Sequence, residues 1–446
     1  MISKNYYLYL LIFFSWNWVT VQAADDALSL ARIGSAASLL HDQIYFFGGS
    51  PVNDTLEQTF ALSLNLSIPF DIASPPWKKL EIENPSLPAF MSSDIVNTEN
   101  PVIYIFANTD LPKTTVTVYK FNENALSLEN VMSQGNLPLS RYEVSAISDD
   151  EGNFYLFGGG IINTSPNVRS NEMNIYGSLS NIWSVNVVPP GGALPILGYS
   201  ATFLDGLILY IGGRSGTFMD VAQTIDAYPF NTIHVYDTKS GSWSIKQAIN
   251  GDQIMARMSH TAVLTTDKRI IMYGGTTWDK KTVKPDLAVL NVNSDKYEWS
   301  VPMPNNPENA PPPLTSHSAM LYENHMIIAF GVTTPSLIAP KSNIYLLDTQ
   351  SYTWLNHYDP PKSTSSTDSI PTSNNSTYSV STSSNNSQES NIKPLLIAVV
   401  VIVPVSIAIG IIVAYFMFKR HRTEKERPIP TPGSVSEASQ SLPKSE

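Results

Sequence analysis

The sequence predicts an all-β fold, and three observations support this prediction. An apolar strand ending in two glycines recurs at intervals of roughly 50 to 60 residues, as in 208–213 (ILYIGG). Two further strands follow each copy, and several copies place an Asp or Asn six residues before a Trp. No long window between residues 24 and 360 has sustained helical periodicity. Repeats of this length, with strands in each copy, are typical of a β-propeller.

The glycines at the end of the second strand define the copies. Four copies have a complete diglycine, and two degenerate copies have Ala107-Asn108 and Gly331-Val332 instead. The glycines assigned this structural role are Gly48, Gly49, Gly158, Gly159, Gly212, Gly213, Gly274, Gly275 and Gly331. Glycine permits positive φ and the close approach of a neighbouring strand, so the two degenerate copies are expected to be locally distorted. Six four-stranded copies predict a six-bladed ring, closed by a strand from residues 25–31 or 355–357.

A turn residue and a Trp mark the last two strands of several copies. The pairs are Asp237 with Trp243, Asn293 with Trp299, and Asp348 with Trp354. The Asp or Asn is expected to bond its own backbone and start a turn, and the Trp to fill the space between neighbouring blades. In the third copy we assign residues 181–183 (NIW) to the third strand, and no fourth-strand Trp is recognised.

The first strands of the copies also align. Arg32, Arg141 and Arg257 open three of them at comparable positions, and His260 and His317 are equivalent in two. Because equivalence across copies favours a structural role, we expect the two histidines to hydrogen-bond a neighbouring strand rather than to bind a metal.

These residues together resemble the kelch repeat, which consists of an apolar strand, a diglycine, and then a strand, Asp and Trp. The resemblance extends over most of residues 24–360. Kelch propellers include the central domain of galactose oxidase and the propeller of attractin-like proteins. The resemblance implies a kelch-type β-propeller, but this fold supports many functions, so function has to be argued from the site.

Composition shifts along the chain predict a single-pass type I membrane protein. Lys4, an apolar run and the small residues near Ala23 indicate a cleaved signal peptide, with an uncleaved anchor as the alternative. An uncharged run from Leu395 to Phe418 is long enough to span a bilayer, and the basic residues after it place the C-terminus in the cytosol. The predicted parts are a signal peptide (1–23), a kelch ectodomain (24–360), a Ser/Thr/Asn-rich disordered stalk (361–393), a transmembrane helix (394–418) and a cytoplasmic tail (419–446).

Composition also excludes several kinds of chemistry. The net charge of −11 and the lack of a basic face argue against nucleic-acid binding. Galactose oxidase uses copper with Tyr and His ligands, one Tyr being cross-linked to a cysteine; this chain has no cysteine, so that cofactor cannot form. No nucleophile elbow and no phosphate-binding loop is present. We therefore expect no catalytic residue, no cofactor and no metal site.

The remaining candidates are modification and recognition sites. Glycosylation sequons begin at Asn53, Asn65, Asn163, Asn374 and Asn385, with a further sequon at Asn375 that overlaps the one at Asn374. Two long loops, 160–180 and 214–231, are expected to lie side by side and to present Arg169, Arg214, Asp220, Asp226 and Tyr228. The sequence thus predicts a non-catalytic binding module at the plasma membrane, with its propeller outside the cell, for an unknown extracellular protein or glycan. The alternatives are a galactose-oxidase-like carbohydrate-active enzyme and a lumenal factor of the secretory pathway.

Overall fold

The computed structural model describes most of the predicted ectodomain. The described residues are 31–52, 61–82, 91–96, 100–108, 115–161, 170–187, 193, 195–215, 227–340 and 343–361. Within them the only helices are two short 3-10 turns, η1 (Gly251–Gln253) and η2 (Pro307–Asn309), so the all-β prediction is confirmed. In this part of the chain, no helix has the length and apolarity that a bilayer span needs. The predicted signal peptide, transmembrane helix and tail lie outside the described residues, as does the stalk beyond residue 361.

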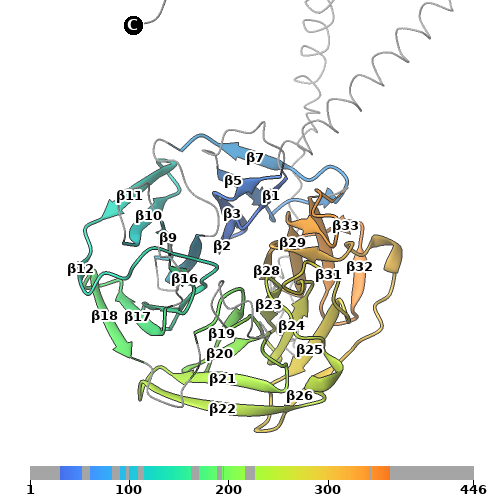
Figure 1. Ribbon diagram of the computed structural model, residues 1–446. Helices are drawn as coiled ribbons and strands as arrows, with labels where there is room; N and C mark the ends of the chain where they lie inside the picture. The colour runs from blue at the N-terminus through green and yellow to red at the C-terminus, as the bar shows by residue number, and fades with distance from the viewer. Residues whose placement is uncertain are drawn as a thin grey trace, which may run out of the picture. The chain divides into compact units, whose positions relative to one another are not determined.

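Four-stranded antiparallel sheets follow one another along the chain and surround a common centre (Figure 1). Sheet A consists of β2 (Ala36–Leu40), β3 (Gln43–Phe47), β5 (Ala61–Asn65) and β7 (Trp77–Leu80). Sheet B consists of β8 (Ser92–Val96), β9 (Val102–Ala107), β10 (Thr117–Asn122) and β11 (Ser127–Val131). Sheet C consists of β14 (Ala146–Ser148), β15 (Asn153–Phe157), β17 (Glu172–Gly177) and β18 (Ile182–Val187).

The second half of the chain repeats this arrangement. Sheet D consists of β19 (Ser200–Leu204), β20 (Leu207–Ile211), β21 (Thr232–Asp237) and β22 (Ser242–Ile249). Sheet E consists of β23 (Thr261–Leu264), β24 (Arg269–Tyr273), β25 (Leu287–Asn291) and β26 (Tyr297–Ser300). Sheet F consists of β28 (Ser318–Tyr322), β29 (His325–Ala329), β31 (Ile344–Asp348) and β32 (Thr353–Leu355).

The core lies between the sheets. The second strand of each sheet is covered on both faces, which explains its continuous apolar run; in β20, Ile208 to Ile211 are all buried. One apolar cluster joins Leu209 of sheet D to Ile270 of sheet E, and another joins Phe46 of sheet A to Ile327 of sheet F. The innermost strands contact one another in chain order, and β28 of sheet F contacts β2 of sheet A, so the described sheets close into a ring.

At several joints, the linker between two sheets pairs with the next sheet at the outer rim. β12 (Gln134–Gly135), in the linker from sheet B, pairs in parallel with β18 of sheet C, and the end of β22 pairs in parallel with β26 of sheet E. At the seam between the last and first sheets, β33 (His357–Tyr358) pairs with β6 (Phe70–Asp71) in the connection before β7. Of the two predicted closing segments, the one around residues 355–357 is therefore confirmed, while residues 25–30 lie outside the described part of the chain.

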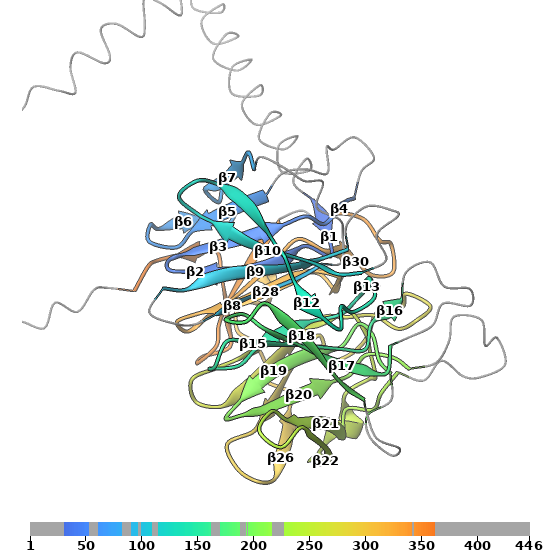
Figure 2. The same cartoon turned by 90° about the vertical axis from the view of Figure 1, so that its left-hand side faces the viewer.

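The two ends of the sheets differ in how their strands are joined. At the loop end, where each second strand finishes, small ladders pair the incoming linker with the residues after the glycines (Figure 2, right). These ladders join β1 (Arg32–Ile33) to β4 (Ser50–Pro51), β13 (Arg141–Tyr142) to β16 (Gly160–Ile161), and β27 (Leu314–Thr315) to β30 (Val332–Thr333). The opposite end, here called the hairpin end, carries the tight turns between the first and second strands.

The diglycines have the geometry that their role requires. Gly212 has φ +62, and a Cβ there would lie 2.8 Å from His260 Cε1 of the next sheet. The second glycine donates its N–H to the following linker, as Gly213 does to Arg257 O at 2.9 Å. The expected close approach of a neighbouring segment is therefore confirmed.

The two degenerate copies differ from each other. In sheet F, Phe330 (φ +64) and Gly331 (φ +82) occupy the two glycine positions, and Gly331 N–H donates to Arg32 O at 2.9 Å. The alignment of Gly331 with the first glycine was therefore wrong by one residue. The expected local distortion of this copy was also wrong, because Phe330 adopts the left-handed backbone of a first glycine. In sheet B, β9 continues through Ala107, which pairs with Thr117, and neither Ala107 nor Asn108 has a positive φ, so the expected local difference is confirmed there.

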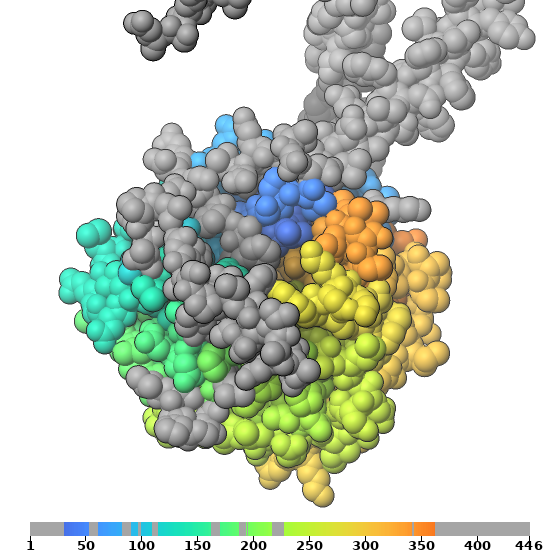
Figure 3. All heavy atoms as spheres, in the orientation of Figure 1, coloured from blue at the N-terminus to red at the C-terminus, as the bar shows by residue number. Residues whose placement is uncertain are grey.

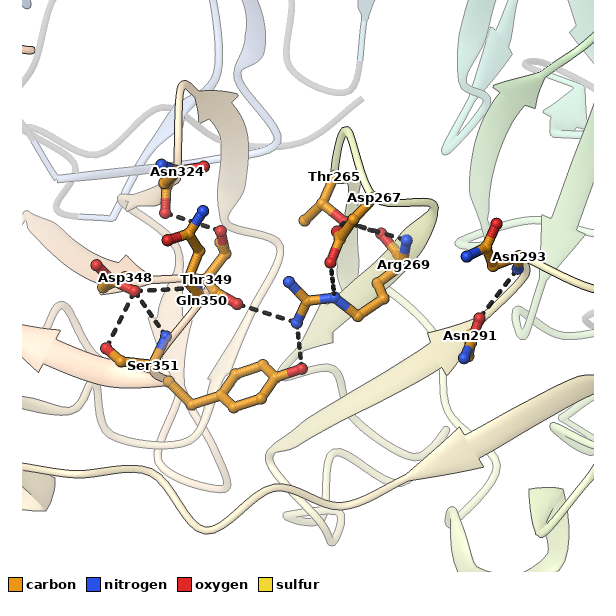
Figure 4. Close-up of polar contacts among 11 residues, drawn as sticks. Thr265, Asp267, Arg269, Asn291, Asn293, Asn324, Asp348, Thr349, Gln350 and Ser351 are labelled. Carbon is orange, nitrogen blue, oxygen red and sulfur yellow. Dashed lines mark hydrogen bonds and ion pairs between the residues drawn. The ribbon is translucent and has the colours of Figure 1, made fainter.

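The turn residues and tryptophans behave as predicted, with two corrections. Asp348 Oδ1 accepts the N–H groups of Gln350 (2.9 Å) and Ser351 (2.8 Å) (Figure 4). In sheet E the turn residue is Asn291, whose Oδ1 accepts Asn293 N–H at 3.0 Å, so the assignment of Asn293 was wrong because this turn is two residues longer. Trp183 was wrongly placed in a third strand: it lies in β18, the fourth strand, opposite Tyr176.

Each fourth-strand Trp packs against the preceding sheet, which confirms the predicted role between blades. The ring-centroid distances are 5.7 Å for Trp183 and Phe106, 4.6 Å for Trp243 and Phe157, 5.3 Å for Trp299 and Phe230, and 5.5 Å for Trp354 and Tyr273. At the seam, Trp77 of sheet A lies 5.2 Å from Phe330 of sheet F. The seam therefore uses the same contact as the joints inside the chain.

Candidate functional site

The innermost strands enclose a channel lined mainly by small side chains. A cavity of about 410 Å³ runs between them, and Asp94 is the one Asp, Glu, Lys or Arg in its described lining. Asp94 Oδ2 accepts Ser148 N–H at 2.7 Å and the Ser148 hydroxyl at 3.0 Å, and burial raises the pKa of this carboxyl. These hydrogen bonds join sheets B and C, so a structural role explains the presence of this carboxyl in the channel.

At the loop end, a chain of backbone hydrogen bonds narrows the channel. Gly34 N–H donates to Ser316 O (3.0 Å), Ser316 to Ser259 (3.0 Å), Ser259 to Gly198 (2.7 Å) and Gly198 to Glu143 (3.2 Å). All five residues have φ between +53 and +66, and they line a cavity of about 120 Å³. A non-glycine residue rarely adopts this conformation unless its surroundings enforce it. Here the hydrogen bonds to the neighbouring linkers hold it.

The two equivalent histidines have the predicted structural role. His260 Nε2 is 3.1 Å from Ser200 Oγ of sheet D, and His317 Nε2 is 2.7 Å from Thr261 Oγ1 of sheet E. Burial lowers the pKa of each imidazole to about 3, so both are neutral at physiological pH. Within the described residues, no group of three or more His, Cys, Asp or Glu is arranged to hold a metal ion.

Three equivalent arginines hydrogen-bond backbone carbonyls. Arg32, Arg141 and Arg257 each donate from Nη1 to the carbonyl of the first glycine of their own sheet, at 3.0, 3.1 and 2.9 Å. Arg257 also donates to the carbonyls of Met255, Lys284 and Pro285. Burial lowers the pKa of Arg32 and Arg257 to about 10, so both remain charged at physiological pH. Their hydrogen bonds hold the backbone at the first glycines in place.

Arg214 lies at the same end, but its Nε and Nη1 do not bind any backbone carbonyl that the structure describes. It directly follows the diglycine of sheet D, and its backbone pairs with Leu197. The residue is 3% exposed, yet in the described part of the chain its Nε and Nη1 have no hydrogen-bond partner. Burial lowers the pKa of the guanidinium, while the nearby charge of Glu143 opposes this effect. A buried donor without an acceptor is costly, which makes Arg214 a candidate contact residue.

Trp278 covers Arg214 from the next sheet. The guanidinium carbon of Arg214 lies 3.8 Å from the centroid of the indole ring, a stacked cation–π contact. Trp278 follows the diglycine of sheet E and is 40% exposed. Glu143 of the sheet C linker, Arg214 and Trp278 therefore lie together across three neighbouring sheets. Figure 3 shows the molecule from the loop end.

The predicted recognition residues are only partly described. Arg214 and Tyr228 lie together, because Arg214 pairs with Ala227 and Tyr228 N–H donates to Gly213 O at 2.9 Å. Arg169, Asp220 and Asp226 lie outside the described residues, as do the sequons at Asn53, Asn163, Asn374 and Asn385. Sequence reasoning missed Glu143 and Trp278. The signal for Trp278 was its place in the segment that directly follows a diglycine, as the two long loops do.

Comparisons with known proteins agree with this architecture. The attractin/LZTR1 β-propeller family matches residues 3–275, and the Kelch-repeats domain of KLHDC2, KLHL20 and DRC7 matches residues 198–386. The solved structure of YjhT covers 73% of this chain and 97% of its own, with a TM-score of 0.52 and 11% sequence identity, a similarity of fold alone.

A curated relative shares a shorter segment. The Rho GTPase-activating protein gacHH of Dictyostelium discoideum is 26% identical over 142 residues, which are 32% of this chain and 9% of that protein. This chain thus spans less than a tenth of that relative. Because the first family match extends over more than half of the sequence, and its repeats have the kelch pattern, the chain belongs to the kelch-repeat β-propellers of the attractin/LZTR1 family.

Proposed function

We propose that this protein is a non-catalytic binding module, anchored in the plasma membrane by one C-terminal helix, that contacts an extracellular protein or glycan through the loop end of a six-bladed propeller. Membership of the kelch propellers suggests a protein-interaction module in general terms. The blade number, the membrane anchor, the location and the absence of catalysis are the further steps of the proposal.

Six blades are supported by the match between repeats and sheets. Each of sheets A to F takes its four strands from one copy of the repeat. The seam between sheets F and A repeats the internal joints, with a second-glycine N–H donating to the next linker and a Trp stacked on the preceding sheet. The membrane anchor and the location are supported by the sequence pattern of residues 1–23 and 394–418.

The observation that carries the binding proposal is Arg214. The three equivalent arginines each bind a backbone carbonyl, and the two histidines each bind a hydroxyl group of the neighbouring sheet. Single nitrogens of Arg141 and of both histidines also have no partner among the described residues, but each of these side chains is held by the hydrogen bond that it does make. Arg214 instead stacks under a partly exposed Trp and keeps two buried nitrogens without an acceptor in the described chain. The residues that contribute most of the binding energy of protein interfaces are enriched in tryptophan, tyrosine and arginine.

The experiment compares variants of the full-length, epitope-tagged protein displayed on cells. Arrays of purified cell-surface proteins and of glycans serve as probes, and we expect saturable binding to one class. Arg214→Ala and Trp278→Ala should each weaken that binding at least tenfold, because truncating a central anchor costs more than about 1.4 kcal/mol. Lys281→Ala is the matched control, since Lys281 is exposed in the same loop as Trp278 and should bind as wild type.

Three results would contradict the proposal. If binding survives both substitutions, the contact surface does not include Arg214 and Trp278. Absence from the cell surface by biotinylation would favour the lumenal alternative. Oxidation of sugars by the purified protein in the presence of copper would overturn the non-catalytic assignment.

A further inference from the structure

Asn65 ends β5 at the hairpin end of sheet A and begins the sequence Asn65-Leu66-Ser67, an acceptor for N-glycosylation. The fold fixes the middle residue. Leu66 is fully buried, its N–H donates to Asp42 O at 2.7 Å, and its carbonyl accepts the hydroxyl of Tyr358 at 2.8 Å. Because Leu66 points into the core, its two neighbours lie on the outer side: Asn65 is half-buried and Ser67 is exposed.

The Asn65 side chain is held with its amide nitrogen available. Oδ1 accepts both the backbone N–H of Ser67 (2.8 Å) and its hydroxyl (2.7 Å), which closes a local turn. Nδ2 donates no hydrogen bond within the described part of the chain, and it is not among the buried polar atoms. The atom to which a sugar would be joined is thus accessible in the folded protein.

A polar groove is lined by Asn65. It has a volume of about 390 Å³ and runs between the hairpin of sheet A and the β10–β11 turn of sheet B, with Asn65 and Ser67 in its wall. His41 Nε2 is 3.6 Å from Glu123 Oε1 across the groove, and the Tyr45 hydroxyl is 3.5 Å from Glu123 Oε2. The groove thus offers donors, acceptors and one tyrosine, and its volume is within the range of small-ligand sites.

We infer that Asn65 carries an N-linked glycan and that its first N-acetylglucosamine occupies this groove, bridging sheets A and B. The sugar supplies both hydroxyl and acetamide groups, which match the imidazole, carboxylate and amide of His41, Glu123 and Asn124. The inference rests on the proposed entry into the secretory pathway. A glycan here covers the hairpin end (Figure 2, left) and leaves the loop end, with Arg214, free for a partner.

The first test maps the modification in the full chain expressed in a eukaryotic cell. Enzymatic deglycosylation in heavy-oxygen water should leave labelled aspartate at position 65. The label should disappear in Ser67→Ala and persist in Ser67→Thr, which keeps the acceptor hydroxyl. If the sequons at Asn53, Asn163, Asn374 or Asn385 are labelled and Asn65 is not, the site assignment fails. If none is labelled, entry into the secretory pathway fails, and the inference fails with it.

The second test asks where the first sugar lies. An endoglycosidase that leaves a single N-acetylglucosamine should give a protein that melts at a higher temperature than the same chain made with N-glycosylation blocked, which keeps the Asn65 side chain and its turn. Asn385→Gln is the control, because that sequon lies in the predicted stalk and should not change the melting temperature. Equal melting temperatures for the trimmed and the unglycosylated wild-type chain would show that the sugar does not occupy the groove.

Discussion

Trp77 of the first sheet and Phe330 of the last sheet stack with ring centroids 5.2 Å apart and an interplanar angle of 29°. Phe330 also contacts Phe46 edge-on at 5.1 Å. These rings fill the seam at which the ends of the repeat array meet. In a closed ring the seam bears the whole cost of bringing distant segments together, so its packing should govern the stability of the complete propeller.

We expect Phe330→Ala to lower the free energy of unfolding by about 3–5 kcal/mol, because it removes a fully buried ring. The combined Trp77→Ala, Phe330→Ala variant should be more stable than the sum of the single effects predicts, with a coupling of about 0.5–1.5 kcal/mol. Urea unfolding followed by tryptophan fluorescence measures both. Strict additivity would mean that the two rings do not share a contact.

Gly212→Ala should destabilise the protein more than Gly206→Ala. Both positions have positive φ, which costs an alanine about 1–2 kcal/mol. At Gly206 the nearest atom to a new Cβ is 3.6 Å away, whereas at Gly212 it lies 2.8 Å from His260 Cε1 and 2.9 Å from Phe230 Cζ. Crowding should add about 1–3 kcal/mol at Gly212 alone. Equal losses in urea unfolding would contradict a packing role for the diglycine.

The buried histidines should make stability depend on pH. The pKa of His260 and of His317 is lowered to about 3 in the folded state, below the ordinary value of about 6.5 for an unfolded chain. Between these pH values the unfolded state binds more protons, so the free energy of unfolding rises with pH, by up to about 1.4 kcal/mol per pH unit for each histidine. Stability should fall from pH 6.5 towards pH 4.

His260→Gln keeps a hydrogen-bonding group near Ser200 Oγ and removes one titrating group, so it should flatten this slope. His357→Gln is the contrast, because hydrogen bonding to Asp71 raises the pKa of His357, which favours the folded state at low pH. Urea midpoints measured from pH 4 to pH 7 separate the two. An unchanged slope in His260→Gln would show that this imidazole does not titrate on unfolding.

Sequence reasoning succeeded where a residue type has one physical role. The diglycines, the histidines of the first strands and the fourth-strand tryptophans are placed by repetition, and the contacts confirm them. It failed where another residue adopts the required backbone. Phe330 has the left-handed conformation of a first glycine, and nothing in the identity of a phenylalanine indicates a positive φ.

The candidate site was harder to predict than the fold, because it depends on contacts between copies. Arg214 was selected from a long loop, but its distinguishing property is the combination of two buried nitrogens without a partner in the described chain and a stacked contact with a partly exposed Trp. Trp278 stacks on it from a different copy, 64 positions later in the chain (278 minus 214). Neither property has a local sequence signal, so only the assembled ring brings the two together.

Asn108 shows how the degenerate second copy compensates for its missing glycines. Its side chain binds the backbone of Arg141 in the next sheet on both sides: Oδ1 accepts the Arg141 N–H at 2.8 Å, and Nδ2 donates to the Arg141 carbonyl. At other joints the second glycine makes such a contact with its own backbone N–H, as Gly159 does to Ile196 O at 2.8 Å. A side-chain amide thus replaces a main-chain amide at this joint.

Asn108→Ala should therefore cost about 1–3 kcal/mol of unfolding free energy, because it leaves two backbone groups of Arg141 without their partner. Asn108→Asp should lose a similar amount, since a carboxylate still accepts the N–H but repels the carbonyl oxygen. Asn293→Ala is the control: the side chain is exposed and makes no hydrogen bond in the described part of the chain. If Asn108→Ala and Asn293→Ala unfold at the same urea concentration, the joint between sheets B and C is held by apolar packing alone.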